Sequence, residues 1–197
     1  MPPLQPTPPR RTALRPTALA VALCLCAALA TATTAQDAGP PREEDVKGAF
    51  VFNFLRLVDW PAEEGRTSGA WSLVVLGDGP TVPGLQSLGG KVVKGYPLDV
   101  QVVSDPRTIP TADALFITAA ASAHLESVVR SVAGAATLTI SEMNGVDVHD
   151  TAINLLVEDG RVVFSVNRSA ARRAGLHLSS RLLTAASYVD GALGRRP

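Results

Sequence analysis

The sequence predicts a single α/β domain with a mixed, largely parallel central sheet flanked by helices, ending in a C-terminal β-hairpin and helices. Three observations support this fold class. A continuous apolar run at Trp71–Leu76 is closed by glycine, aspartate and proline, as in a strand buried on both faces. Similar runs alternate with helical stretches, which favours parallel pairing. Near the C-terminus, two β-rich runs flank Asp159-Gly160, a pair typical of a hairpin turn.

The individual elements follow from local periodicity and from the residues that end each one. A helix is expected over residues 43–58, because apolar side chains recur every three or four positions after three acidic residues that favour a helix N-terminus. The polar segment 63–69 is expected to be a surface loop. Ser179 or Ser180 is expected to cap the last helix. We expect strands at 71–76, 98–103, 114–118 and 136–140, hairpin strands at 152–157 and 161–167, and helices at 82–88, about 120–133, 168–175 and 179–189.

The first 35 residues have the layout of a secretory signal peptide. Three arginines and no acid precede the apolar residues 18–30, a stretch too short to span a bilayer as a helix. Small residues predict cleavage after Ala35, with Ala32 as the alternative. We therefore expect a signal peptide at 1–35, a flexible segment at 36–42, the α/β domain at 43–190 and a disordered tail at 191–197.

Charge and cysteine content narrow the function classes. The chain has 18 basic and 18 acidic residues, and loss of the three leader arginines leaves 15 against 18, a net charge near −3. This balance does not favour nucleic acid as a partner. Cys24 and Cys26 both lie in the leader, so the mature chain has no thiol for a disulfide, a metal or catalysis. We expect an exported protein with no stable membrane insertion after leader cleavage.

A glycine-rich turn after the strand 71–76 invites comparison with dinucleotide-binding loops. Gly77, Gly79 and Gly84 follow the strand, but the fingerprint needs a glycine where Val82 stands. Pro80 also removes an amide donor from this turn. An ordinary strand-to-helix turn is the favoured interpretation, and no cofactor is predicted.

The tightest cluster of possible metal ligands is Asp147, His149 and Asp150. A further ligand would have to come from His124 or His177, so a solvated turn is the favoured interpretation and no metal is predicted.

Hydrolytic chemistry has no clear sequence signature either. There is no Gly-x-Ser-x-Gly motif, and the adjacent carboxylates Glu43 with Glu44 and Glu63 with Glu64 are most simply solvated. We predict no catalytic residue, although an enzyme remains the third hypothesis because triads are assembled in space.

The densest positive patch of the mature chain lies between residues 168 and 181. A solvated helix face is the simpler interpretation, and a docking surface for an acidic partner is the sharper one. The candidate partner-binding residues are Arg168, Arg172, Arg173, His177 and Arg181.

Phe50, Phe52 and Phe54 alternate within the first helix, so a narrow apolar stripe cannot bury all three. A fully buried helix is the favoured explanation. The alternative is that Phe52 is an exposed apolar contact.

Two segments together resemble the YfiR family of exported bacterial regulators. The middle of the chain also follows the family's order, so the resemblance covers about residues 44 to 189. The first segment is Lys47-Gly48-Ala49-Phe50-Val51-Phe52-Asn53-Phe54 followed by Val58-Asp59-Trp60-Pro61. The second runs from Ile153-Asn154-Leu155 through Glu158-Asp159-Gly160-Arg161-Val162 to Ala170-Ala171-Arg172-Arg173-Ala174-Gly175-Leu176 and Ser179-Ser180-Arg181-Leu182-Leu183.

The resemblance implies a periplasmic protein, often dimeric, without known catalytic activity. Its implied function is to repress a membrane-bound diguanylate cyclase by contact, which lowers cyclic-di-GMP signalling. The implied partner is the periplasmic region of an inner-membrane diguanylate cyclase or a related receptor. The redox response of disulfide-containing members is not expected, because the mature chain has no cysteine. The alternative is a periplasmic small-ligand-binding protein with a crevice near residues 77–80, at the carboxyl ends of the strands.

Overall fold

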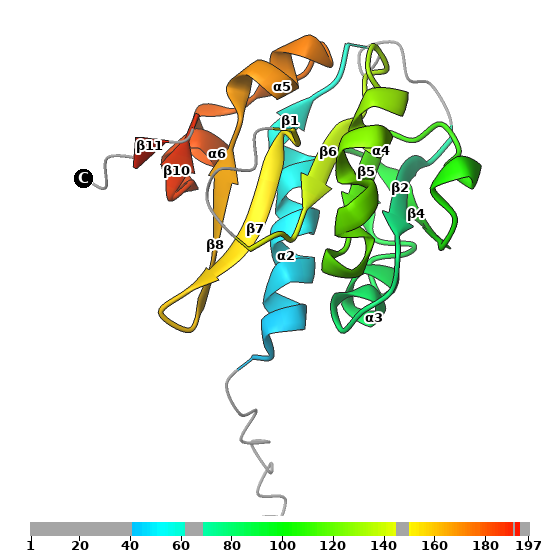
Figure 1. The fold of residues 1–197 in the computed structure, drawn as a ribbon. Coiled ribbons are helices and arrows are strands. Elements are labelled where there is room, and N and C mark those ends of the chain that lie inside the picture. The colour runs from blue at the N-terminus through cyan, green and yellow to red at the C-terminus, as the bar shows by residue number, and fades with distance from the viewer. Residues whose placement is uncertain (1–40, 62–68, 145–149, 191, 194–197) are drawn as a thin grey trace, which may run out of the picture. The chain divides into compact units, whose positions relative to one another are not determined.

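The structure, a computed structural model, describes residues 41–61, 69–144, 150–190 and 192–193. Figure 1 shows the strands side by side with helices around them. The strands are β1 (Val58–Asp59), β2 (Trp71–Leu76), β3 (Val92–Val93), β4 (Tyr96–Val103), β5 (Ala114–Ile117), β6 (Leu138–Ser141), β7 (Ile153–Glu158), β8 (Arg161–Val166), β9 (His177–Leu178), β10 (Tyr188–Val189) and β11 (Ala192–Leu193). The helices are α2 (Glu43–Leu57), α3 (Thr81–Gln86), α4 (Leu125–Ser131), α5 (Arg168–Arg173) and α6 (Ser180–Ala185), with 3-10 turns η1 (Pro106–Thr108) and η2 (Ala119–His124).

The predicted mixed, largely parallel sheet is confirmed. In the described residues it has the order β11-β10-β8-β7-β6-β5-β2-β4-β3, and β1 pairs separately with β9. The strands from β4 through β2, β5 and β6 to β7 are parallel, whereas β7 and β8 form the predicted antiparallel hairpin. No helix in these residues is long and apolar enough to cross a membrane.

The sheet is buried on both faces because alternate side chains enter two different cores. In β2, Leu73 and Val75 join a large cluster that includes α2, whereas Val74 and Leu76 join a smaller cluster under η2 and α4. Figure 1 shows α2 and α4 on opposite sides of the strands. This two-sided burial explains why β2 is a continuous apolar run with the predicted bounds.

The first helix is amphipathic, so the prediction of a fully buried helix was wrong. Phe54 is buried and Phe50 half-buried, and both contact Phe164 of β8, with ring centroids 4.9 and 5.5 Å apart. Phe52 points away from this cluster, toward Arg56 and Lys91. The alternative, an exposed contact at Phe52, therefore describes the helix better.

The helix expected at about 120–133 is instead a 3-10 turn followed by the short helix α4. The amide of Ala121 donates to the carbonyl of Thr118, three residues earlier, and Ala121 packs close to Gly77. This tertiary contact accompanies tighter winding than helix propensity alone predicts.

The last helix is shorter than expected, because Tyr188–Val189 forms β10 rather than a final helical turn. Ser187 and Asp190 donate backbone hydrogen bonds to Phe164 and Val166 of β8. Pairing with the open edge of β8 thus overrides the helical spacing of Val189. The predicted cap at Ser179 is confirmed, since its hydroxyl accepts from the amide of Leu182.

Several predictions concern residues outside the described part. The signal peptide at 1–35, its cleavage sites, residues 36–40 and residues 62–68 lie there. Of the predicted tail at 191–197, residues 192–193 form β11 and the others lie outside as well.

Candidate functional site

The carboxyl ends of β2, β5 and β6 meet at one edge of the sheet, where α/β proteins commonly bind ligands. Gly77 follows β2, Thr118 follows β5 and Glu142 follows β6. This edge also contains the crevice predicted near residues 77–80.

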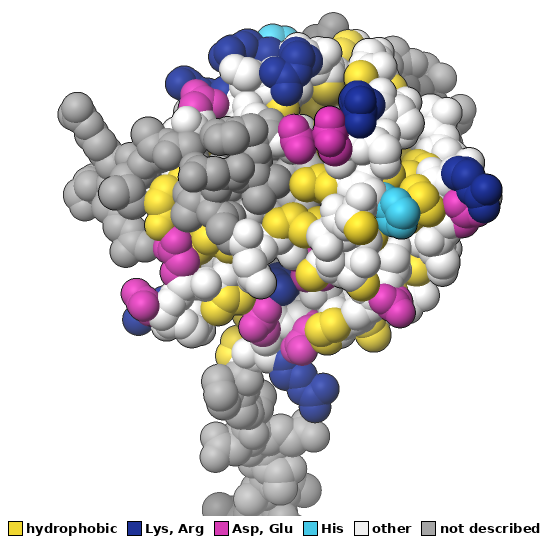
Figure 2. Space-filling view, viewed as in Figure 1, with side chains coloured by type: hydrophobic (Ala, Val, Ile, Leu, Met, Phe, Trp, Pro, Cys, Tyr) yellow, Lys and Arg dark blue, Asp and Glu magenta, His cyan; other side chains and the backbone are white. Residues whose placement is uncertain are grey.

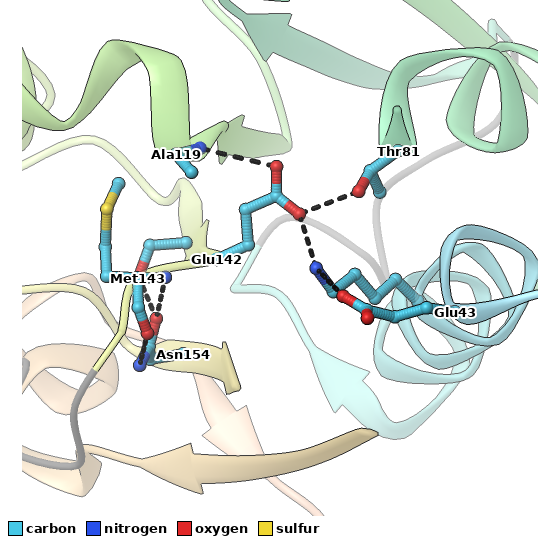
Figure 3. A network of polar contacts seen from close by, with 8 residues as sticks. Glu43, Thr81, Ala119, Glu142, Met143 and Asn154 are labelled. Atoms are coloured by element: carbon cyan, nitrogen blue, oxygen red, sulfur yellow. Dashed lines mark hydrogen bonds and ion pairs between the residues drawn. The ribbon is translucent and has the colours of Figure 1, made fainter. Parts of the chain in front are cut away.

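Glu142 occupies this edge as a buried carboxylate with an exposed fraction of 8%. One oxygen, Oε2, accepts from the Thr81 hydroxyl at 2.7 Å and from the Lys47 ammonium at 3.0 Å. The other, Oε1, accepts from the amide of Ala119 at 3.3 Å. Figure 3 shows the carboxylate between α2, α3 and η2. An acidic side chain of the chain itself therefore lies where an anionic ligand would bind.

Lys47 joins this carboxylate to a second one, because its ammonium also lies 2.8 Å from Glu43. Burial opposes the charged form of Lys47, but hydrogen bonds to Glu43 and Glu142 outweigh it and raise the Lys47 pKa above its usual 10.5. A base with a raised pKa stabilises the fold fully below its unfolded value. This contribution therefore persists at neutral pH and is lost only as the pH rises past 10.5.

A second network holds the turn that carries Glu142. The Asn154 side chain accepts from the amide of Met143 at 2.8 Å and donates to its carbonyl at 3.1 Å. It also accepts from the Ser141 hydroxyl, which lies 2.8 Å from the Thr151 hydroxyl. All four residues are buried, so the turn after β6 is fixed from below.

The glycines of the predicted dinucleotide loop have packing explanations. A Cβ on Gly77, whose φ is +95°, would lie 2.3 Å from Oγ1 of the buried Thr118. Gly84 packs on α2, where a Cβ would lie 3.1 Å from the carbonyl oxygen of Glu44. Among the described residues, the Thr118 hydroxyl has no hydrogen-bond partner. Gly77 thus allows β2 and β5 to end in close contact.

The possible metal ligands are not brought together in the described residues. Asp147 and His149 lie outside the described part, while Asp150, His124 and His177 are exposed. Within the searched ranges, no group of three or more His, Cys, Asp or Glu residues could hold a metal ion. Of the adjacent carboxylates, Glu43 pairs with Lys47, and residues 63 and 64 are not described.

The candidate arginine patch extends over α5, β9 and α6. Arg168 forms an ion pair with Asp190 at 2.6 Å, which partly neutralises it. Arg172 donates to the Ser169 hydroxyl, and Arg172, Arg173, His177 and Arg181 are exposed. Figure 2 shows basic side chains and a histidine gathered at the top, where Figure 1 places α5. Asp190 lies 22 residues from Arg168, so their pairing had no local sequence signal.

Arg173 also borders a groove of about 320 Å³ between α4 and α5. Val129 and Val132 form one wall, Ala170 and Ala174 the other, and Asp150 lies at the rim with Arg173. Below the basic cluster, Figure 2 shows hydrophobic side chains on the same face. The patch is therefore an arginine-rich border beside a shallow apolar groove.

Comparison with known proteins gives one family match. Residues 44–187 match the family described as YfiR/HmsC-like. No curated protein matches the chain. Among solved structures, it is similar to an ABC domain from Streptococcus pneumonia in complex with L-Trp, at 12% identity and a TM-score of 0.47. That match covers 65% of this chain and 58% of the other, a likeness too low to assign a function.

The family match covers the described fold from the start of α2 to the turn after α6. It includes Lys47, Glu142 and four residues of α5 and α6 that carry the arginine patch. The order of the motifs noted in the sequence is therefore kept within one folded unit, and the chain belongs to the YfiR/HmsC-like family.

Proposed function

We propose that this protein is a non-enzymatic periplasmic regulator that represses a membrane-bound diguanylate cyclase by protein–protein contact. The observation that carries the proposal is the family match over residues 44–187, which spans nearly all of the described domain. The signal-peptide layout of residues 1–35 supports a periplasmic location.

A regulator of this kind needs surface contacts rather than a reactive centre. A domain that binds one state of a receptor shifts the receptor's equilibrium by its difference in affinity for the two states. The strand edge that could hold a ligand contains Glu142, already bonded to Lys47 and Thr81. This internal network supports a structural role for the edge and directs attention to the outer surface.

Deleting the gene is expected to raise cellular cyclic-di-GMP several-fold, because the cyclase loses its restraint. Restoring the exported protein should reverse the rise, whereas a form lacking residues 1–35 should not. Cyclic-di-GMP is measured by mass spectrometry in all three strains. A leaderless form that lowers cyclic-di-GMP as well as the exported form would refute contact in the periplasm.

The surface that we propose for this contact is the exposed part of the arginine patch. Replacing Arg172 and Arg173 with glutamate is expected to abolish most of the restoration of cyclic-di-GMP, because charge reversal repels an acidic receptor surface. Both side chains are exposed, so the free energy of unfolding should change by less than about 1 kcal/mol.

A matched control carries the same charge change elsewhere. Arg107→Glu with Arg130→Glu alters two exposed arginines of η1 and α4 and should restore cyclic-di-GMP like the wild type. Equal restoration by both double variants would show that α5 is only a solvated helix face.

A further inference from the structure

The outer face of α2 carries a stripe of side chains that the core does not use. Asp45, Ala49 and Arg56 are exposed and Phe52 is half-buried. At 3.6 residues per turn, these four positions lie within about 60° of one another around the helix. In the described residues, Asp45 makes no hydrogen bond or ion pair, so its charge is available to a neighbour.

A groove of about 290 Å³ runs beside this stripe, between α2 and the segment of α3 and its following turn. Gly48 and Gly84 lie at its floor, and Phe52 stands at its border. The Arg56 guanidinium and the Lys91 ammonium lie 5.9 and 5.7 Å from the Phe52 ring centroid. The groove therefore has an acidic end at Asp45 and a basic end around Phe52.

This polarity makes the stripe complementary to itself. When a second α2 lies antiparallel across it, with the two-fold axis midway between Asp45 and Arg56, each Asp45 meets Arg56 of the other copy. In the same register, the large ring of Phe52 meets the small side chain of Ala49. Asn53 meets Gly48, where the glycine leaves space for the amide. Such an arrangement, with the same patch on both copies, is the isologous contact of a two-fold dimer.

We propose that a second copy of this chain docks antiparallel on α2, with Phe52 of each copy in the groove beside Ala49 of the other. The stripe from Asp45 to Arg56 is about 16 Å long, at 1.5 Å per residue. An interface of this length is small, so the dimer forms reversibly and its population depends on concentration. The contact lies on α2 and is independent of the arginine patch on α5.

Charge exchange tests this register directly. Asp45→Arg and Arg56→Asp are each expected to weaken dimerisation at least about tenfold, because the two-fold axis repeats every like-charge contact. The double variant exchanges both charges and should restore the dimer. An equimolar mixture of the two single variants should also form heterodimers, since every Arg then meets an Asp. Sedimentation velocity of the purified protein over a range of concentrations measures each association.

A steric variant tests the position of Phe52. Ala49→Glu should weaken association on the order of a hundredfold, because it places a carboxylate against the inserted ring in both halves of the interface. Ala123→Glu, at an exposed position of η2, should dimerise like the wild type. Circular dichroism verifies that each variant is folded. A wild-type monomer at all concentrations would overturn the proposal, as would a dimer that ignores Ala49→Glu or the charge exchange.

Discussion

Replacing Glu142 with alanine is expected to lower the free energy of unfolding by about 3 kcal/mol, the usual cost of removing one partner of a buried ion pair. The variant leaves the Lys47 ammonium, the Thr81 hydroxyl and the Ala119 amide without their shared acceptor. Lys47 retains only Glu43, whose side chain is 48% exposed. Urea unfolding followed by circular dichroism measures the loss.

Glu43→Ala is the matched control, because it removes a carboxylate from the same lysine. Glu43 is exposed and reached along one helix, so its loss should cost less than about 1 kcal/mol. Glu142→Gln should fall between the two, since an amide oxygen keeps the acceptor without the charge. If Glu142→Ala and Glu43→Ala cost the same, the carboxylate would not hold α2, α3 and η2 together.

Replacing Gly77 with alanine is also expected to cost about 3 kcal/mol, for two separate reasons. Its φ of +95° lies in the region that L-residues avoid, and its Cβ would collide with Oγ1 of Thr118 at 2.3 Å. Thr118 is fully buried and β-branched, which restricts its movement away from the added methyl group. Thermal and urea unfolding both measure this effect.

Two comparisons separate the backbone from the collision. Gly90→Ala, with a φ of +77° and no atom within 4 Å, should cost only about 1 kcal/mol. Adding Thr118→Ala to Gly77→Ala should recover much of the loss, whereas Thr118→Val should not, because a methyl group then replaces the hydroxyl. Equal costs for Gly77→Ala and Gly90→Ala would exclude close packing as the role of Gly77.

Local sequence was sufficient where an element is defined by its own residues. Trp71–Leu76 is apolar throughout because both faces of β2 are covered, and Asp159 and Gly160 adopt the positive φ that a tight hairpin needs. In contrast, β1, β9 and β10 are two residues long and exist through their partners. A pattern of period two or 3.6 cannot specify such short strands.

The same distinction applies to the candidate site. The exposed arginines could be found as a cluster in the sequence, but the neutralisation of Arg168 depends on Asp190. Lys47 and Glu142 are 95 residues apart, and no spacing rule joins them. The one available signal was weak: a carboxylate directly after a buried parallel strand lies at the ligand-binding edge.

The packing of α2 has a consequence for the order in which the chain can fold. Phe50 and Phe54 rest on Phe164, and Lys47 rests on Glu142, so the first helix docks on residues that are synthesised late. Contacts so distant along the chain delay folding until most of the polypeptide is present. A chain that crosses a membrane unfolded, as we propose for this one, gains from that delay. The helix that emerges first waits for its partners, and the domain closes only after translocation is nearly complete.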